Sequence, residues 1–131
     1  MEMRLRFENS GYETVEVSET NPGRFQLETT PLLAPAPVYL GDLIEATEQP
    51  DGTHRFIRVV APAPMRHASW VVPRSFVESA DYRAFNEAVH AVGGQVECVM
   101  GGVLYAHVPE SSSFDASAEL GRYLSSDWPE A

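Results

Sequence analysis

The chain of 131 residues has a formal net charge of -10, and all nine of its basic side chains are arginines. Its length suits one domain, or two small lobes that share a core. An acidic surface repels phosphate backbones, so nucleic-acid binding is not expected, whereas a basic protein partner would be attracted. No apolar run reaches the ~18 residues of a membrane helix, and no signal-peptide pattern is present, so a cytoplasmic protein without membrane contact is expected.

The first half of the chain is predicted to be rich in β-strands. Apolar and polar residues alternate in three segments separated by short turns, which predicts an antiparallel meander over residues 3–7, 15–17 and 25–29. A proline-rich stretch then leads through Leu40-Gly41-Asp42 into a hairpin from Leu43 to Ala61, whose turn is Pro50-Asp51-Gly52. Within this hairpin, residues 56–60 are predicted to be buried on both faces over part of their length. Five strands favour a small antiparallel sheet or a partly closed barrel.

The second half changes pattern after Pro62-Ala63-Pro64. A strand is predicted over residues 68–72. It precedes a helix that begins after Ser79 and ends at Gly93-Gly94, and the apolar side chains within this helix recur at helical spacing. A hairpin around a two-residue turn at Gly101-Gly102 and a second helix from about Asp115 to Leu124 follow. This order predicts a split β-α-β, ferredoxin-like layer.

The predicted fold class is therefore α+β. A small antiparallel β-sheet or barrel lobe over residues 1–64 is followed by an α+β lobe over residues 65–131. Each lobe alone has little core at this length, so we expect the two to unfold as one cooperative domain.

Several short motifs, taken in order, resemble a bacterial family of domains of unknown function with a Leu-Gly-Asp and Phe-x-Arg-Val-Val pattern. The matching segments are Phe25 to Pro31, Leu40-Gly41-Asp42, Phe56-Ile57-Arg58-Val59-Val60, His67-Ala68-Ser69 and Gly94-Gln95-Val96-Glu97. The resemblance covers roughly residues 12 to 110 and departs from the pattern at Met65-Arg66, where a small pair is expected. The resemblance implies the α+β architecture predicted above, and it implies no particular activity.

The sequence has no metalloprotease, nucleophile-elbow, phosphate-loop or dinucleotide motif, so neither catalytic residues nor a cofactor is predicted. The histidines, which are His54, His67, His90 and His107, lack the spacing of a metal site, and no metal is expected. The single cysteine, Cys98, shares a strand face with Val96 and Met100 and is predicted to be a buried structural thiol.

Four residues are candidates for ligand binding: Asp42, His67, Arg58 and Trp70. Asp42 either hydrogen-bonds its own turn after Gly41 or forms an acid–base or ligand-anchoring pair with His67. Arg58 either balances a buried carboxylate or covers a sheet edge with its aliphatic stem. Trp70, like Tyr105, either stacks on a ligand or belongs to the core.

The leading functional prediction is a non-enzymatic bacterial module that binds an unidentified protein or small molecule. An acidic, immunity-type protein that masks a basic toxin is one form of it. The alternatives are a small enzyme with a cleft built on Asp42 and His67, and a structural homodimer.

Overall fold

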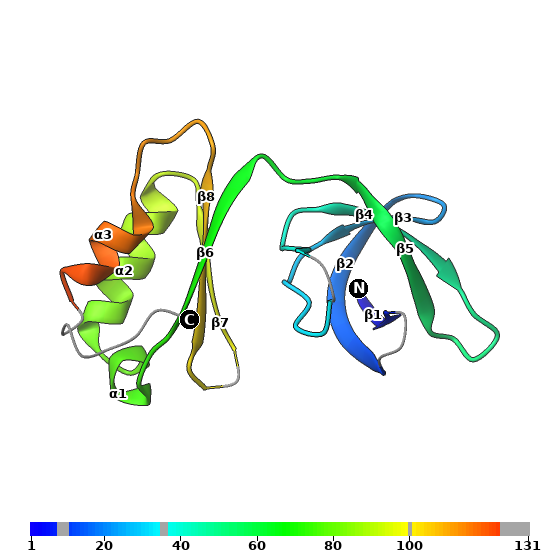
Figure 1. Cartoon of the computed structure of the whole chain (residues 1–131), viewed down its shortest axis with the longest axis horizontal. Coiled ribbons are helices and arrows are strands. Elements are labelled where there is room, and N and C mark those ends of the chain that lie inside the picture. Colours follow the sequence, from blue (N-terminus) through cyan, green and yellow to red (C-terminus); the bar gives the residue numbers. More distant parts are fainter. Residues whose placement is uncertain (8–10, 35–36, 100, 124–131) are drawn as a thin grey trace. The chain divides into compact units, whose positions relative to one another are not determined.

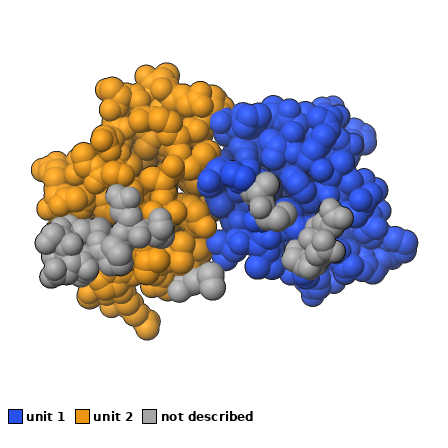
Figure 2. Space-filling view, in the orientation of Figure 1, with its two compact units in different colours: residues 1–63 blue, residues 64–131 orange. Residues whose placement is uncertain are grey.

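The computed structural model describes residues 1–7, 11–34, 37–99 and 101–123, and the chain forms two compact units. Unit 1 is Met1–Ala63 and unit 2 is Pro64–Ala131, one residue from the predicted boundary (Figures 1 and 2). Each unit buries a hydrophobic cluster of its own. The protein is of the mixed α+β type, as predicted. Among the described residues, no helix combines the length and the apolar character needed to cross a membrane.

Unit 1 is a closed barrel of five strands. The strands are β1 (Glu2–Arg6), β2 (Tyr12–Asn21), β3 (Arg24–Leu27), β4 (Leu43–Glu48) and β5 (His54–Ala61). Each strand is antiparallel to the next in the chain. In a meander with an odd number of strands, the first and last run in the same direction. The seam that closes the ring is accordingly a parallel pairing of β1 with β5, so the sheet goes beyond the partly closed form predicted.

The prediction that residues 56–60 are buried on both faces is wrong. Phe56 and Val59 are half-buried against the barrel core, whereas Ile57 is 38% exposed. The pairing of β1 with β5 ends at Arg6 and Arg55, because β1 itself ends there. The later part of β5 therefore runs beyond the closed ring and turns its outer side chains to solvent.

Unit 2 is a three-stranded sheet with the strand order β6-β8-β7. Its elements are β6 (Met65–Val71), α1 (Arg74–Val77), α2 (Ala80–Ala91), β7 (Gln95–Val99), β8 (Val103–Pro109) and α3 (Ala116–Gly121). Both β6 and β7 are antiparallel to β8, so they run in the same direction on its two sides. The short helix α1 was not predicted.

The helix boundaries in unit 2 follow the predicted signals closely. The Ser79 hydroxyl accepts a hydrogen bond from the backbone N–H of Tyr82 at the start of α2, and Gly93 ends the helix at a φ of +84°. Asp115 caps α3, whose predicted last residue, Leu124, lies outside the described residues. Val99 of β7 pairs with Val103 of β8, and the predicted turn residues Gly101 and Gly102 lie between them.

The two faces of the unit 2 sheet differ in chemistry. Alternate residues of a strand point to opposite faces. On β8, Leu104, Ala106 and Val108 join the buried cluster that packs against the helices, which lie on one side of the sheet (Figure 1). Tyr105 and His107 occupy the alternate positions and therefore belong to the other face. Polar side chains of three strands gather there.

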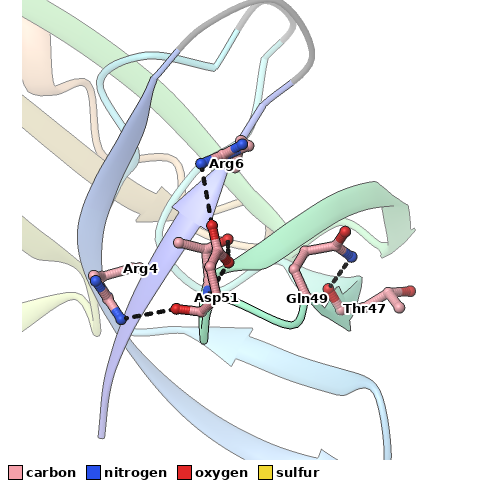
Figure 3. Close-up of polar contacts among 6 residues, drawn as sticks. Arg4, Arg6, Thr47, Gln49 and Asp51 are labelled. Carbon is pink, nitrogen blue, oxygen red and sulfur yellow. Dashed lines mark hydrogen bonds and ion pairs between the residues drawn. The ribbon is translucent and has the colours of Figure 1, made fainter.

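The turn between β4 and β5 contains Asp51 and Gly52, and Figure 3 shows the polar contacts of Asp51. The Asp51 carboxylate accepts hydrogen bonds from the hydroxyl and the backbone N–H of Thr53, at 2.6 and 3.0 Å. Gly52 adopts a φ of +86°, which glycine tolerates best. The two hydrogen bonds from Thr53 are the largest effects on the pKa of Asp51 and lower it. Desolvation opposes them, and the nearby Arg6 and Arg4 guanidinium groups add smaller lowering effects.

Replacing Thr53 with valine should raise the pKa of Asp51 toward its ordinary value, because the hydroxyl that favours the carboxylate is lost. A depressed carboxyl pKa stabilises the fold above the unfolded-state pKa, and this contribution is lost as the pH falls through the folded-state value. Carboxyl-carbon NMR titration of the variant measures the shift. Thr47→Val, on the neighbouring strand, is the matched control and should leave Asp51 unchanged; an equal pKa in all three proteins would contradict the assignment.

Candidate functional site

Asp42 is part of the barrel's own backbone network. It is 3% exposed, and its two carboxylate oxygens accept hydrogen bonds from the backbone N–H groups of Tyr39 and Ala63, at 3.0 and 2.8 Å. The preceding Gly41 has a φ of +92°. This arrangement matches the turn interpretation of Asp42. Both oxygens hold the chain ends that flank β4 and β5, and they are already used.

The structure places two further sequence candidates, Arg58 and Trp70, in an exposed ion pair and in the core of unit 2, respectively. Arg58 forms a cross-strand ion pair with Glu45 at 2.9 Å, and its side chain is 55% exposed. Trp70 is 3% exposed in the core of unit 2, where its ring meets Phe85 edge to face at 6.2 Å between centroids. The interpretation of Trp70 as a ligand-stacking residue is therefore wrong, because its ring lies on the face of β6 that packs against the helices.

His67 forms a hydrogen-bonded chain with two residues that the sequence analysis did not select. Its Nδ1 lies 2.7 Å from Nδ1 of His107, and Nε2 of His107 lies 2.6 Å from a carboxylate oxygen of Glu97. His67 and His107 are direct register partners on β6 and β8, and Glu97 lies on β7, opposite Tyr105. The Tyr105 ring is stacked parallel to His107 at 6.1 Å. We call His67, His107 and Glu97 the histidine chain.

The geometry of the histidine chain constrains where its protons lie. A neutral imidazole carries one N–H, and a carboxylate only accepts. If His107 donates its Nε2–H to Glu97, its Nδ1 must accept the hydrogen bond from Nδ1–H of His67. The chain tolerates a further proton on His67 Nε2, but a proton on both Nδ1 atoms would place two donors face to face. His107 is fully buried and the Glu97 side chain is 12% exposed, so these constraints act in a desolvated setting.

A cavity of about 150 Å³ lies in unit 2 beside the outer edge of β6. Its walls are three consecutive residues of β6 and four residues around the start of α3, two before the helix and two in it, and its floor comes from β8: Arg66, His67, Ala68, Phe114, Asp115, Ala116, Ser117, Ala106 and Val108. His67 thus belongs both to the cavity wall and to the histidine chain. The cavity combines an apolar floor with polar groups at the rim, which is the usual character of a small-ligand site.

Arg66 fixes the wall opposite β6. Its Nη2 donates hydrogen bonds to the carbonyl oxygens of Ser112 and Phe114, at 2.6 and 2.9 Å. Those bonds hold the segment before α3 against the strand. The Nε and Nη1 groups have no partner within the described part of the chain. At the same rim, one Asp115 oxygen accepts from the Ala118 N–H at 3.0 Å and the other is unused among the described residues.

Cys98 is partly buried against the core of unit 2, on the face toward the helices. Its predicted neighbour Met100 lies outside the described residues. Burial raises the pKa of the thiol, which disfavours the reactive thiolate at neutral pH.

Ellman titration should therefore show Cys98 reacting much more slowly in the native protein than in the urea-unfolded chain. The rate should rise with pH as the thiolate forms. Native and unfolded rates that are equal at pH 7 would contradict the burial of this thiol and would make Cys98 a candidate nucleophile.

No protein-family model matches this chain, and no curated protein does. A solved structure of a hypothetical protein from Neisseria gonorrhoeae is similar to it, with 18% sequence identity and a TM-score of 0.62. The match covers 94% of this chain and 87% of that one. At this identity the likeness concerns the fold alone.

Proposed function

We propose that the protein is a non-enzymatic binding module that takes a small ligand in the cavity beside β6. The observation that carries this proposal is the cavity itself, with its apolar floor and the guanidinium group of Arg66 held at its rim. Its volume of about 150 Å³ is that of cavities that accommodate a benzene-sized molecule. Sites for drug-sized ligands begin at roughly 300 Å³, so the ligand is small.

The rim chemistry defines the class of ligand. The Nε–H and Nη1–H groups of Arg66, which have no partner among the described residues, can each donate a charge-assisted hydrogen bond to a carboxylate oxygen. The second oxygen of Asp115 suits a hydrogen-bond donor. A short carboxylic acid with a small apolar or amino-bearing chain satisfies both, with its carbon atoms over Ala106 and Val108.

The sheet of unit 2 supports the same proposal at the level of architecture. The parallel strands β6 and β7 flank the antiparallel β8, and α1 and α2 connect them, which supports our proposal that unit 2 is a split β-α-β layer of the ferredoxin-like kind. Such layers serve many functions, so the cavity and not the fold identifies the site. A bacterial, cytoplasmic setting remains part of this proposal.

The test is amide NMR with acetate, butyrate and glycine as probes. We expect saturable shifts at Ala68, Ala106 and Ser117. Ala68→Leu, which places a larger side chain in the cavity wall, should abolish them. Ala118→Leu adds the same side chain at an exposed position of α3 outside the lining and should leave them intact. Equal loss in both variants, or shifts located away from the cavity, would contradict the proposal.

The enzyme alternative receives no support from Asp42, whose two oxygens are bound by backbone N–H groups. An acid–base role requires a carboxylate that can reach its substrate. Recognition of a protein partner and homodimerisation remain predictions, which sedimentation of the purified protein alone and with candidate basic partners would decide.

A further inference from the structure

A row of register partners crosses the outer surface of the barrel at the seam where β1 meets β5. Arg6 pairs with Tyr12 of β2 on one side and with Arg55 of β5 on the other, and Arg55 pairs with Thr47 of β4. Directly paired residues share a face of the sheet. This is the outer face, because the neighbouring Leu5 points into the core. The row contains two guanidinium groups and no carboxylate.

The pairing of Arg6 with Arg55 is unfavourable unless a negative charge lies close to the two guanidinium groups. Like charges at directly opposed strand positions repel each other. Arg55 is exposed and has no hydrogen-bond or ion-pair partner in the part of the chain that the structure describes. Arg4, two positions before Arg6 on the same face, adds a third guanidinium group, which lies 5.6 Å from the centre of the Tyr12 ring. Three of the nine arginines of an acidic chain thus share one small surface.

Asp51 neutralises this surface only in part (Figure 3). Its carboxylate lies 3.5 Å from Nη2 of Arg6, and its backbone carbonyl accepts from Nη2 of Arg4 at 3.5 Å. Both contacts are long, and the Arg6 and Asp51 side chains are 47% and 55% exposed, so solvent screens the attraction. The shorter hydrogen bonds of Asp51 go to Thr53. Asp51 therefore neutralises the arginines only weakly, and a bound anion from solution could take over this role.

We propose that Arg4, Arg6 and Arg55 bind the phosphate group of a small phosphate ester of the nucleoside monophosphate class. Guanidinium groups bind phosphate oxygens in a bidentate manner, and neighbouring ones can share a phosphate dianion. The Tyr12 ring, which is 49% exposed, offers an apolar surface for the aromatic base. The net charge of -10 opposes a polyanion much more strongly than a single phosphate, which favours a mononucleotide over a nucleic acid. This site lies in unit 1 and does not depend on the cavity of unit 2.

The experiment titrates the full chain with adenosine monophosphate, inorganic phosphate and adenosine, and follows the amide signals of Arg6, Tyr12 and Arg55. We expect the monophosphate to bind most tightly, with an affinity that falls as salt is added. Arg55→Gln should weaken binding about tenfold, because one charge-assisted contact is lost. Asp51→Asn should strengthen binding roughly threefold, because it removes the competing charge and keeps an acceptor for Thr53.

Arg83→Gln changes the net charge equally at an exposed position of α2 and should leave the affinity unchanged. A loss as large in Arg83→Gln as in Arg55→Gln, or no gain in Asp51→Asn, would overturn the proposal. Tighter binding of a single-stranded oligonucleotide than of the monophosphate would overturn the choice of a small ligand. Equal shifts with adenosine and with the monophosphate would overturn the role of the phosphate.

Discussion

Replacing His107 with alanine should lower the free energy of unfolding by roughly 3 kcal/mol, as breaking a buried, hydrogen-bonded pair does. His107 is fully buried and bonds through both ring nitrogens. Its removal deprives the Glu97 carboxylate of the His107 hydrogen bond and leaves a cavity under the stacked Tyr105 ring. Urea unfolding at pH 7.5 or so measures the change. His90→Ala, at an exposed position of α2, should stay within about 0.5 kcal/mol of the wild type.

A second variant tests where the protons of the histidine chain lie. Glu97→Gln keeps an oxygen that can accept the Nε2–H of His107, so a neutral chain should lose only about 1 kcal/mol. A charged His107 would instead lose its counter-ion, and the cost would approach that of His107→Ala. A loss below about 0.5 kcal/mol for His107→Ala itself would contradict the packing and hydrogen bonding assigned to this ring.

The strand and helix pattern could be predicted because it depends on local sequence. Period-two alternation located β1 to β3, the turn at Pro50-Asp51-Gly52 located the hairpin of β4 and β5, and the Ser79 cap and Gly93 bounded α2. The closed barrel could be predicted only in part. Its closure depends on the pairing of Leu5 with His54, a long-range register that alternation does not encode. The four-residue helix α1 is too short for helical periodicity to reveal.

The candidate site was harder to predict for the same reason. His67 was selected for its place near the lobe boundary, but His107 and Glu97 lie far along the chain and come near it through the pairing of β8 with β6 and with β7. The alternation of His107 with Tyr105 predicted a strand, but it did not indicate that His107 would contact His67. A usable signal existed: a histidine on each of two strands and a glutamate on a third, all at positions alternate to the apolar core residues. The cavity gave no such signal, since segment 114–117 meets β6 through long-range contacts, which are the hydrogen bond from Arg66 to Phe114 and shared burial in the core of unit 2.

Asp42→Ala should be about as destabilising as the change at His107, at roughly 3 kcal/mol. The carboxylate is 3% exposed and satisfies two backbone N–H groups, those of Tyr39 and Ala63. Alanine would remove the carboxylate acceptor of both N–H groups, and a buried donor that loses its acceptor costs about 1–3 kcal/mol. Asp42→Asn keeps one acceptor oxygen and should lose about half as much. Thermal and urea unfolding of the full chain measure both variants.

Gly41→Ala completes this prediction, because the same turn requires the backbone angle of glycine. At a φ of +92° an alanine is strained, and its Cβ would lie 3.0 Å from the Cβ of Ala63. We expect a loss of about 1–2 kcal/mol, since Ala63 has to shift and with it the N–H that Asp42 binds. Asp81→Asn, at an exposed position in the first turn of α2, is the matched control and should change stability by less than about 0.5 kcal/mol. If Asp42→Ala were no more destabilising than Asp81→Asn, the two hydrogen bonds would not be holding the turn, and Asp42 would again be a candidate for binding a ligand.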